Sequence, residues 1–229
     1  MESRWENLPM TEKRNTNWES IYQAALGEYG LLANADKLRC LGQELLRWNK
    51  THNLTGYSSW QQVALSLILD SLMLLPYCQG ESCLDIGAGA GFPGLVLAMA
   101  RPHMRVVLID ARRKRVSFQQ HICRLLKLSN VTPVWGRAGE EPDVLKAARF
   151  ATVTCKALAG LTQALNLCQH YMQENGIILL PRGIGEEEQC RALLKNHDPE
   201  WNYRLYYYTL PEFPAQRLIL SAVKPGAPI

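Results

Sequence analysis

Hydrophobic positions recur along this chain with two periods, one typical of helices and one of buried strands. In residues 18–50 apolar side chains recur every three or four positions, which predicts two helices with a break near Gly30. Residues 60–76 repeat this helical pattern and end at a proline. The stretch between them, residues 48–59, is polar and has little periodicity, so we expect a loop there.

The rest of the chain alternates short apolar runs with helical segments. The runs that predict strands are residues 82–87, 105–111, 131–135, 150–157, 177–183, 203–210 and 217–223. The predicted helices are residues 94–99, 111–130, 161–173 and 186–196. Strands that alternate with helices form parallel sheets, so this pattern predicts a doubly wound α/β fold with an antiparallel hairpin at its end. Pro133 predicts an edge position for its strand.

These patterns divide the chain into three parts. Residues 1–16 lack periodicity and are expected to be a flexible tail. Residues 17–78 form a helical segment, and residues 79–229 form the α/β domain. We expect the two to pack as one compact unit, because 229 residues suffice for one domain of this class with a small appendage.

The densest signal for chemistry is the stretch CLDIGAGAGFPG at residues 83–94. Asp85 closes an apolar run, and Gly87, Gly89 and Gly91 follow before the next helix. Glycine tolerates positive φ and has no Cβ, so a ligand can approach the backbone closely. The pattern predicts a sharp turn from strand to helix, with free N–H groups that face a nucleoside cofactor.

The glycine spacing alone leaves two cofactors open. Gly89, Gly91 and Gly94 satisfy the dinucleotide pattern, and Asp110 lies about where the ribose-binding acid of a nicotinamide enzyme is expected. Asp85, two residues before the first glycine, completes the form apolar-Asp-x-Gly-x-Gly-x-Gly, which resembles motif I of class I methyltransferases. This resemblance implies S-adenosyl-L-methionine as the cofactor. An oxidoreductase would also need a hydride-transfer constellation, and the chain offers no convincing one.

Composition narrows the cellular setting. The chain carries 25 Lys and Arg against 21 Asp and Glu, a net charge of +4, which permits a nucleic-acid partner without requiring one. Its seven cysteines form no C-x-x-C pair or zinc spacing, so we expect reduced thiols and no metal. The first residues are polar and no apolar run reaches membrane-spanning length, so a cytoplasmic protein without a membrane partner is expected.

A run of four cations opens the predicted helix after Asp110. The residues are Arg112, Arg113, Lys114 and Arg115. Cations at a helix N-terminus are electrostatically unfavourable, because that end of the helix dipole is positive. Their placement therefore predicts a use, and an RNA phosphate backbone is the obvious partner. A solubilising cluster is the alternative interpretation.

Taken together, these segments resemble the RsmG (GidB) family of small-subunit ribosomal RNA guanine-N7 methyltransferases. The matching segments are WNKTHNLT (48–55), ILDSL (68–72), LDIGAGAGFPG (84–94), LIDARRKRVSF (108–118) and GRAGE (136–140). The resemblance covers residues 36–224. It implies a class I S-adenosyl-L-methionine-dependent methyltransferase with a Rossmann-like, mainly parallel sheet, acting as a monomer on 16S ribosomal RNA or the small ribosomal subunit.

The resemblance also assigns roles by position. The expected cofactor-binding residues are Asp85, Gly87, Gly89, Gly91, Phe92, Asp110, Ala138 and Gly139. Among them, Asp110 would bind the ribose, and Ala138 and Gly139 would flank the adenine. Lys156 would lie beside the reactive end of the cofactor as the candidate catalytic residue. Arg182 is a candidate RNA contact with the four cations, and Lys156 and Arg182 would steer a phosphate or the purine O6.

The chain departs from the family pattern at several positions. Ser66-Leu67 replaces Arg-His, Cys155-Lys156-Ala157 replaces Ser-Arg-Ala, Pro181-Arg182-Gly183 replaces Leu-Lys-Gly, and Gly139 replaces a common acid. Arginine and lysine are not interchangeable at a bidentate or stacked site. Two alternatives therefore stay open: a paralogue that modifies another RNA or a small molecule, and a non-catalytic RNA-binding relative.

Overall fold

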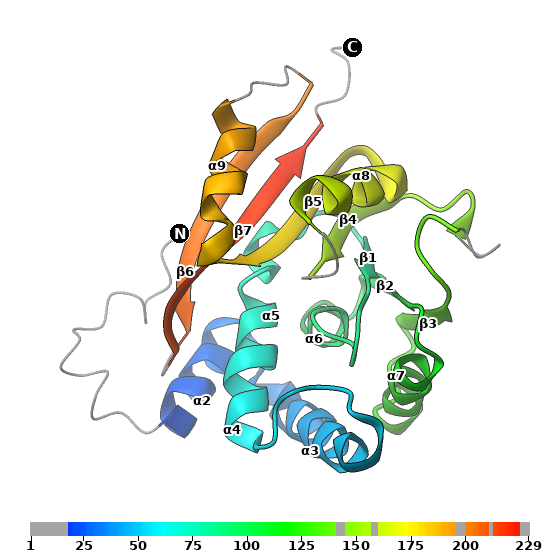
Figure 1. The fold of residues 1–229 in the computed structure, drawn as a ribbon. Helices are drawn as coiled ribbons and strands as arrows, with labels where there is room; N and C mark the ends of the chain where they lie inside the picture. Colours follow the sequence, from blue (N-terminus) through cyan, green and yellow to red (C-terminus); the bar gives the residue numbers. More distant parts are fainter. Residues whose placement is uncertain (1–17, 141–144, 157–159, 196–199, 211–212, 225–229) are drawn as a thin grey trace.

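A single seven-stranded sheet forms the centre of the computed structural model (Figure 1). The structure describes residues 18–140, 145–156, 160–195, 200–210 and 213–224, so the predicted tail at 1–16 lies outside the described residues. The strands are β1 (Ser82–Ile86), β2 (Arg105–Asp110), β3 (Val131–Trp135), β4 (Phe150–Cys155), β5 (Met172–Gly183), β6 (Asn202–Leu210) and β7 (Phe213–Val223).

The sheet order is β3-β2-β1-β4-β5-β7-β6. Strands β1 to β5 run parallel, while β7 pairs antiparallel with both β5 and β6. This confirms the predicted doubly wound sheet with an antiparallel closing strand. β3 lies at one edge, as Pro133 predicted, because proline has no N–H to donate to a second neighbour.

Helices cover both faces of the sheet. The N-terminal segment comprises α2 (Trp18–Glu28), the 3-10 turn η1 (Leu32–Asn34), α3 (Ala35–His52), α4 (Trp60–Val63), the π-helix η2 (Ala64–Leu69), α5 (Asp70–Leu72) and the 3-10 turn η3 (Leu75–Tyr77). Within the α/β part lie α6 (Gly94–Ala100), α7 (Arg113–Leu125), α8 (Leu161–Tyr171), the 3-10 turn η5 (Ile184–Glu186) and α9 (Glu187–Lys195). Figure 1 shows α8 on the side opposite α3 and α7.

Strand periodicity creates the two cores. Along β2, Val106 and Leu108 pack into the core beneath α3, α6 and α7, while Val107 and Ile109 pack into the core beneath α8. Successive strand side chains point to opposite faces, so a strand that is apolar throughout feeds both cores. The N-terminal helices belong to the first of these cores, which is why the helical segment and the α/β domain share one interior.

The polar stretch at 48–59 is a loop only from Asn53 onward, so the predicted helix end was wrong. Helix α3 continues to His52 and ends where Asn53 takes a left-handed conformation, with φ 49°. The polar residues of its last turns have local roles. The amide of Asn49 donates to the Tyr57 carbonyl at 3.2 Å and accepts from the Thr55 N–H at 2.9 Å. Side-chain bonds to the following loop explain the polarity that suggested a break.

Two further boundaries differ from the prediction. The segment 60–76 is an α-helix interrupted by η2, and its proline lies inside η3 instead of ending the helix. Strand β5 starts at Met172, whereas the sequence predicted a helix to 173 and a strand from 177. Asn175 has φ 55°, and the register with β4 shifts at this point. A strand irregularity therefore occupies the place where Gly176 suggested a helix end.

Gly42 provides a test of how α3 packs on α4. An added Cβ at Gly42 would lie 2.7 Å from Cε3 of Trp60, so the ring rests against the bare helix backbone. We expect Gly42→Ala to lower the free energy of unfolding by about 1–3 kcal/mol through overpacking. As the control, Gly27→Ala in α2 meets its nearest atom, in Leu32, at 3.6 Å and is expected to stabilise by about 0.5 kcal/mol. Urea unfolding measures the stability of both variants. Equal changes in the two would contradict the close contact between Gly42 and the Trp60 ring.

Candidate cofactor site at the carboxyl edge of the sheet

The glycine loop joins β1 to α6 in the sharp turn that the sequence predicted. Gly87, Gly89 and Gly91 have φ values of 68°, 59° and 92°, a region that favours glycine. The expectation of free N–H groups was wrong, however. The loop N–H groups that donate to acceptors within the protein are those of Gly87, Ala88, Gly89, Gly91, Phe92 and Gly94. Most N–H groups of the loop thus donate within the protein and hold its conformation.

Asp85 lies beneath this loop and is fully buried. Its Oδ2 accepts a hydrogen bond from the Gly94 N–H at 2.9 Å, which fixes the start of α6. Its Oδ1 has no partner among the described residues. Burial raises the pKa of Asp85 to about 7, although the Gly94 hydrogen bond and the positive charge of Lys156 oppose the rise. A buried carboxylate oxygen with unused capacity suits a cationic or hydrogen-donating ligand group.

Asp110 ends the neighbouring strand β2 and ties three elements together. Its Oδ2 accepts from the Gly89 N–H at 2.9 Å and from the Arg115 guanidinium at 3.2 Å. Its Oδ1 accepts from the Arg112 N–H at 2.9 Å and from no other described donor. Although it closes a strand, Asp110 is only 4% exposed. Its carboxylate therefore organises the loop, and one oxygen keeps a lone pair for a ligand.

A cavity of about 360 Å³ adjoins Asp110 at the ends of β2 and β3. Its lining residues are Ala111, Trp135, Gly136, Arg137 and Glu140. Next to it in the chain, Gly139 has φ 89°, and its N–H donates to the hydroxyl of buried Tyr171 at 2.8 Å. The replacement of the family's acid by glycine thus coincides with a backbone conformation that glycine favours. A flat ring has room between the ends of these two strands.

Lys156 lies beside the glycine loop because of the sheet register. Ile86 of β1 pairs with Cys155 of β4, so the next residues, Gly87 and Lys156, leave the sheet side by side. The Lys156 ammonium is bound to Oδ2 of Asp70 at 2.5 Å. Sequence reasoning assigned no role to Asp70, although a single acid within the apolar segment 60–76 was a usable signal.

Phe92 is 5% exposed and packs in the core under α6 and α7. A contact between its ring and the cofactor stays a prediction. The two acids lie on neighbouring strands, because β1 pairs directly with β2, and Asp85 is opposite Leu108 in the register.

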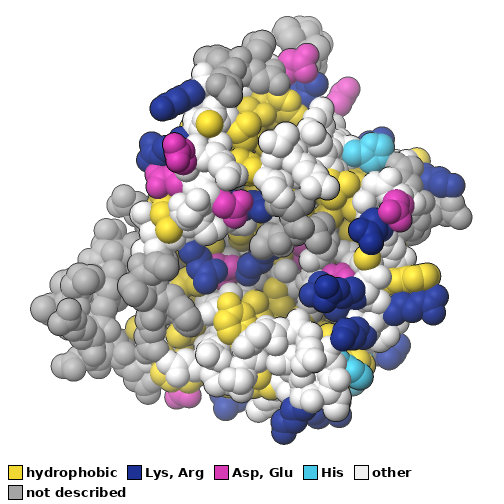
Figure 2. All heavy atoms as spheres, viewed as in Figure 1, with side chains coloured by type: hydrophobic (Ala, Val, Ile, Leu, Met, Phe, Trp, Pro, Cys, Tyr) yellow, Lys and Arg dark blue, Asp and Glu magenta, His cyan; other side chains and the backbone are white. Residues whose placement is uncertain are grey.

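The four consecutive cations separate into two kinds. Arg115 is bound to Asp110, and the Arg113 guanidinium lies 4.0 Å from the centre of the Trp135 ring. Arg112, Arg113 and Lys114 are exposed, whereas Arg115 is half-buried. Figure 2 shows Lys and Arg side chains gathered on the side of the molecule where Figure 1 draws β3 and α7. Arg115 is thus paired with Asp110, and the other three cations of the run are exposed to a polyanion.

Arg182 does not belong to this surface. Its side chain is buried on β5, with the residue 5% exposed, and its Nη1 lies 3.5 Å from Glu186. This position corrects the expectation of a surface cation, because a polynucleotide cannot reach a buried guanidinium without rearrangement.

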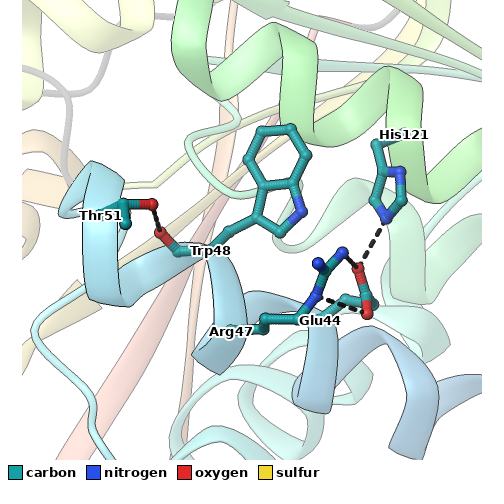
Figure 3. A network of polar contacts seen from close by, with 5 residues as sticks. All are labelled: Glu44, Arg47, Trp48, Thr51 and His121. Atoms are coloured by element: carbon teal, nitrogen blue, oxygen red, sulfur yellow. Dashed lines mark hydrogen bonds and ion pairs between the residues drawn. The ribbon is translucent and has the colours of Figure 1, made fainter.

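Helix α7, which carries the cations, is anchored on α3. Figure 3 shows the carboxylate of Glu44 between Arg47 and His121, with Trp48 above them. The His121 Nε2 lies 2.6 Å from Glu44, and the Trp48 ring packs 5.5 Å from Phe118, centre to centre. Trp48, the first residue of the motif WNKTHNLT, and Glu44, one turn before it, thus hold α7 against the helical segment.

Comparison with known proteins agrees with this geometry. Residues 34–201 match the family model GidB, rRNA small subunit methyltransferase G. The chain belongs to this family. It is 36% identical over 174 residues to a ribosomal RNA small subunit methyltransferase G from Haemophilus influenzae (strain ATCC 51907 / DSM 11121 / KW20 / Rd), covering 76% of this chain and 82% of the relative. A relative of the same description from Aeromonas salmonicida is 39% identical, covering 67% and 73%.

Solved structures show the same fold. An O-methyltransferase from Bacillus cereus in complex with SAH has a TM-score of 0.60 at 16% identity, covering 81% of this chain and 91% of that one. A putative rRNA methylase from Clostridium thermocellum has a TM-score of 0.51 at 17% identity, covering 69% and 94%. Membership of the GidB family favours S-adenosyl-L-methionine over the nicotinamide alternative.

Two absences concern the described part of the chain. Its histidine, cysteine and acidic side chains form no group that could hold a metal ion. Among its helices, none has the length and apolar character needed to span a membrane.

The raised pKa of Asp85 makes a prediction about stability. Between pH 4 and 7 the folded state keeps the Asp85 proton that the unfolded state has released. The free energy of unfolding therefore falls as the pH rises. Relative to Asp85→Asn, the wild type should lose about 1.4 kcal/mol of unfolding free energy per pH unit, and at most about 4 kcal/mol in all.

Urea unfolding without cofactor at pH 4, 5, 6, 7 and 8 measures this difference. The surface variant Asp36→Asn serves as the control, because Asp36 is exposed on α3. Parallel stability curves for the wild type and Asp85→Asn would contradict the raised pKa.

Proposed function

We propose that this protein transfers a methyl group from S-adenosyl-L-methionine to N7 of a guanosine in 16S ribosomal RNA. The observation that carries the proposal is the pair of acids at neighbouring strand ends, Asp85 and Asp110, with the glycine loop between them. The family match supports the RNA substrate.

The residues present fit the cofactor. The buried Oδ1 of Asp85, without a partner among the described residues, suits the amino group at the methionine end. Among the described donors, Oδ1 of Asp110 accepts from the Arg112 N–H alone, which leaves a lone pair for a ribose hydroxyl. The cavity next to Asp110 suits the adenine, as does the nearby backbone of Ala138 and Gly139.

When bound, the cofactor supplies an electrophilic methyl group on a sulfonium. Guanine N7 is a lone-pair nucleophile and has no proton to remove, so no general base is needed. The task of the protein is to align the base and exclude water, which is a positioning role. Lys156, which the sheet register brings beside Gly87, would donate toward the guanine O6, next to N7. A target base inside a helix must first leave its stack.

Methyl transfer is tested with radiolabelled S-adenosyl-L-methionine on small subunits and free 16S RNA from a strain that lacks this protein. We expect label on one guanosine, released as 7-methylguanine on acid hydrolysis. Label on another atom or another RNA would support the paralogue alternative. RNA binding without any transfer, although S-adenosylhomocysteine binds, would support the non-catalytic alternative.

The exposed cations give a second prediction. The double variant Arg112→Gln/Lys114→Gln should weaken RNA binding and reduce its salt slope, because each lost phosphate contact removes about 0.7–0.9 from the slope. Arg113 and Arg115 are left intact because they hold Trp135 and Asp110.

Filter binding at several salt concentrations measures the slope. Lys195→Gln on α9, which Figure 1 draws far from α7, is the matched control. An unchanged slope in the double variant would show that these two cations only solvate the helix.

A further inference from the structure

Three side chains from three elements converge on the carboxyl group of Asp70. Lys156 Nζ lies 2.5 Å from Oδ2, and the Arg217 guanidinium donates to Oδ1 at 2.9 Å. The Tyr208 hydroxyl also donates to Oδ1, at 2.8 Å. Tyr208 on β6 and Arg217 on β7 are direct partners in the sheet register, so they reach Asp70 from the same face.

This cluster contains two cations and one carboxylate. Asp70 is 1% exposed, while the Lys156 and Arg217 side chains are 24% and 25% exposed. One carboxylate cannot neutralise both, so a positive charge remains in a mostly buried place, where an unpaired charge is costly. The contacts with Asp70 use one of three ammonium donors of Lys156 and one of five guanidinium donors of Arg217.

The cluster also adjoins the candidate cofactor site. The register of β1 and β4 brings Lys156 beside Gly87, and the charge of Lys156 acts on buried Asp85. Because burial raises the pKa of Asp85 to about 7, this acid is only partly ionised at neutral pH and offsets the excess charge incompletely.

We propose that Lys156 and Arg217, held in place by Asp70, bind an anionic oxygen of a ligand. In this arrangement Asp70 is a positioning residue, and the antiparallel strand β7 contributes directly to the site. The inference rests on the proposed function, whose cofactor and RNA substrate are two sources of such an oxygen. One is the carboxylate at the methionine end of the cofactor, and the other is a phosphate of the RNA.

Binding measurements on the full chain separate the two sources. S-Adenosylhomocysteine carries the carboxylate, whereas 5′-methylthioadenosine lacks it. If Arg217→Met or Lys156→Met weakens S-adenosylhomocysteine binding about tenfold and leaves 5′-methylthioadenosine binding unchanged, the anion is the cofactor carboxylate. If the variants instead leave both unchanged and reduce the salt slope of 16S RNA binding by about 0.7–0.9, the anion is an RNA phosphate.

A similar cluster elsewhere in the fold provides the control. Glu187 on α9 accepts from Arg191 at 2.7 Å and from the Tyr207 hydroxyl at 2.9 Å, but it lies near the surface. Arg191→Met should alter neither the nucleoside affinities nor the salt slope. Arg217→Lys keeps the charge at 217 and should restore most of the binding that Arg217→Met loses.

Asp70→Asn tests the positioning role. The substitution raises the net charge of the cluster, so an effect of charge alone predicts tighter anion binding. If Asp70 instead holds the two cations in position, the variant should bind the anion more weakly. Tyr208→Phe should also weaken anion binding, and it changes no charge. Thermal unfolding checks that each variant is folded.

The outcomes distinguish this inference from the proposed function. Binding losses limited to the Lys156 and Arg217 variants support the site even if the wild type transfers no methyl group, in which case the proposed function fails alone. Unchanged affinities and slopes in both methionine variants overturn the site while methylation stands. A wild type that binds neither S-adenosylhomocysteine nor RNA overturns both, and tighter binding by Asp70→Asn overturns the positioning role.

Discussion

The carboxylate of Asp110 is the contact on which the candidate cofactor site depends. It accepts the Gly89 N–H from the loop after β1, and the Arg112 N–H and Arg115 guanidinium from the start of α7. One buried acid thus sets the distance between the glycine loop and the helix that carries the cations. The arrangement also explains why cations are tolerated at the N-terminus of α7, since the nearby carboxylate offsets the unfavourable helix dipole.

Asp85 and Asp110 end neighbouring strands but have different surroundings. Within the described part of the chain, Asp85 accepts one hydrogen bond, and burial raises its pKa to about 7, whereas Asp110 has three donors around it. The difference follows from their neighbours. Asp85 is at the centre of the sheet between β2 and β4, under a loop whose N–H groups are mostly used elsewhere. A ligand that donates to Asp85 would therefore relieve an existing electrostatic cost.

The sequence allowed the sheet, the glycine turn and the two acids to be predicted, because each depends on local patterns. Apolar runs ending in acids identify β1 and β2, and the positive φ of Gly87, Gly89 and Gly91 is a local requirement. The exact end of α3 was not predictable in this way. The polar residues of its last turn are satisfied by loop atoms as distant as Tyr57, and such contacts leave no periodic signal.

The long-range part of the site was missed for the same reason. Asp70 and Arg217 are 147 positions apart, and their ion pair depends on the register of β6 and β7, which no local pattern specifies. For the four cations, the sequence suggested one common role that the structure does not support. They form one uniform run in the sequence, yet their environments differ, because the Arg115 side chain pairs with Asp110 and the Arg113 side chain lies over the Trp135 ring.

The closing hairpin of β6 and β7 does more than cover a sheet edge, because it brings Arg217 to Asp70. Parallel strands β1, β2 and β4 bring their carboxyl ends to one edge, where the glycine loop and Lys156 meet. Arg217 lies in the first half of β7. Because β7 runs antiparallel to β5, this residue is opposite Gly183, at the carboxyl end of β5. A parallel last strand would place its start at the opposite edge of the sheet. The direction of β7 is therefore what allows a cation from the end of the chain to share Asp70 with Lys156.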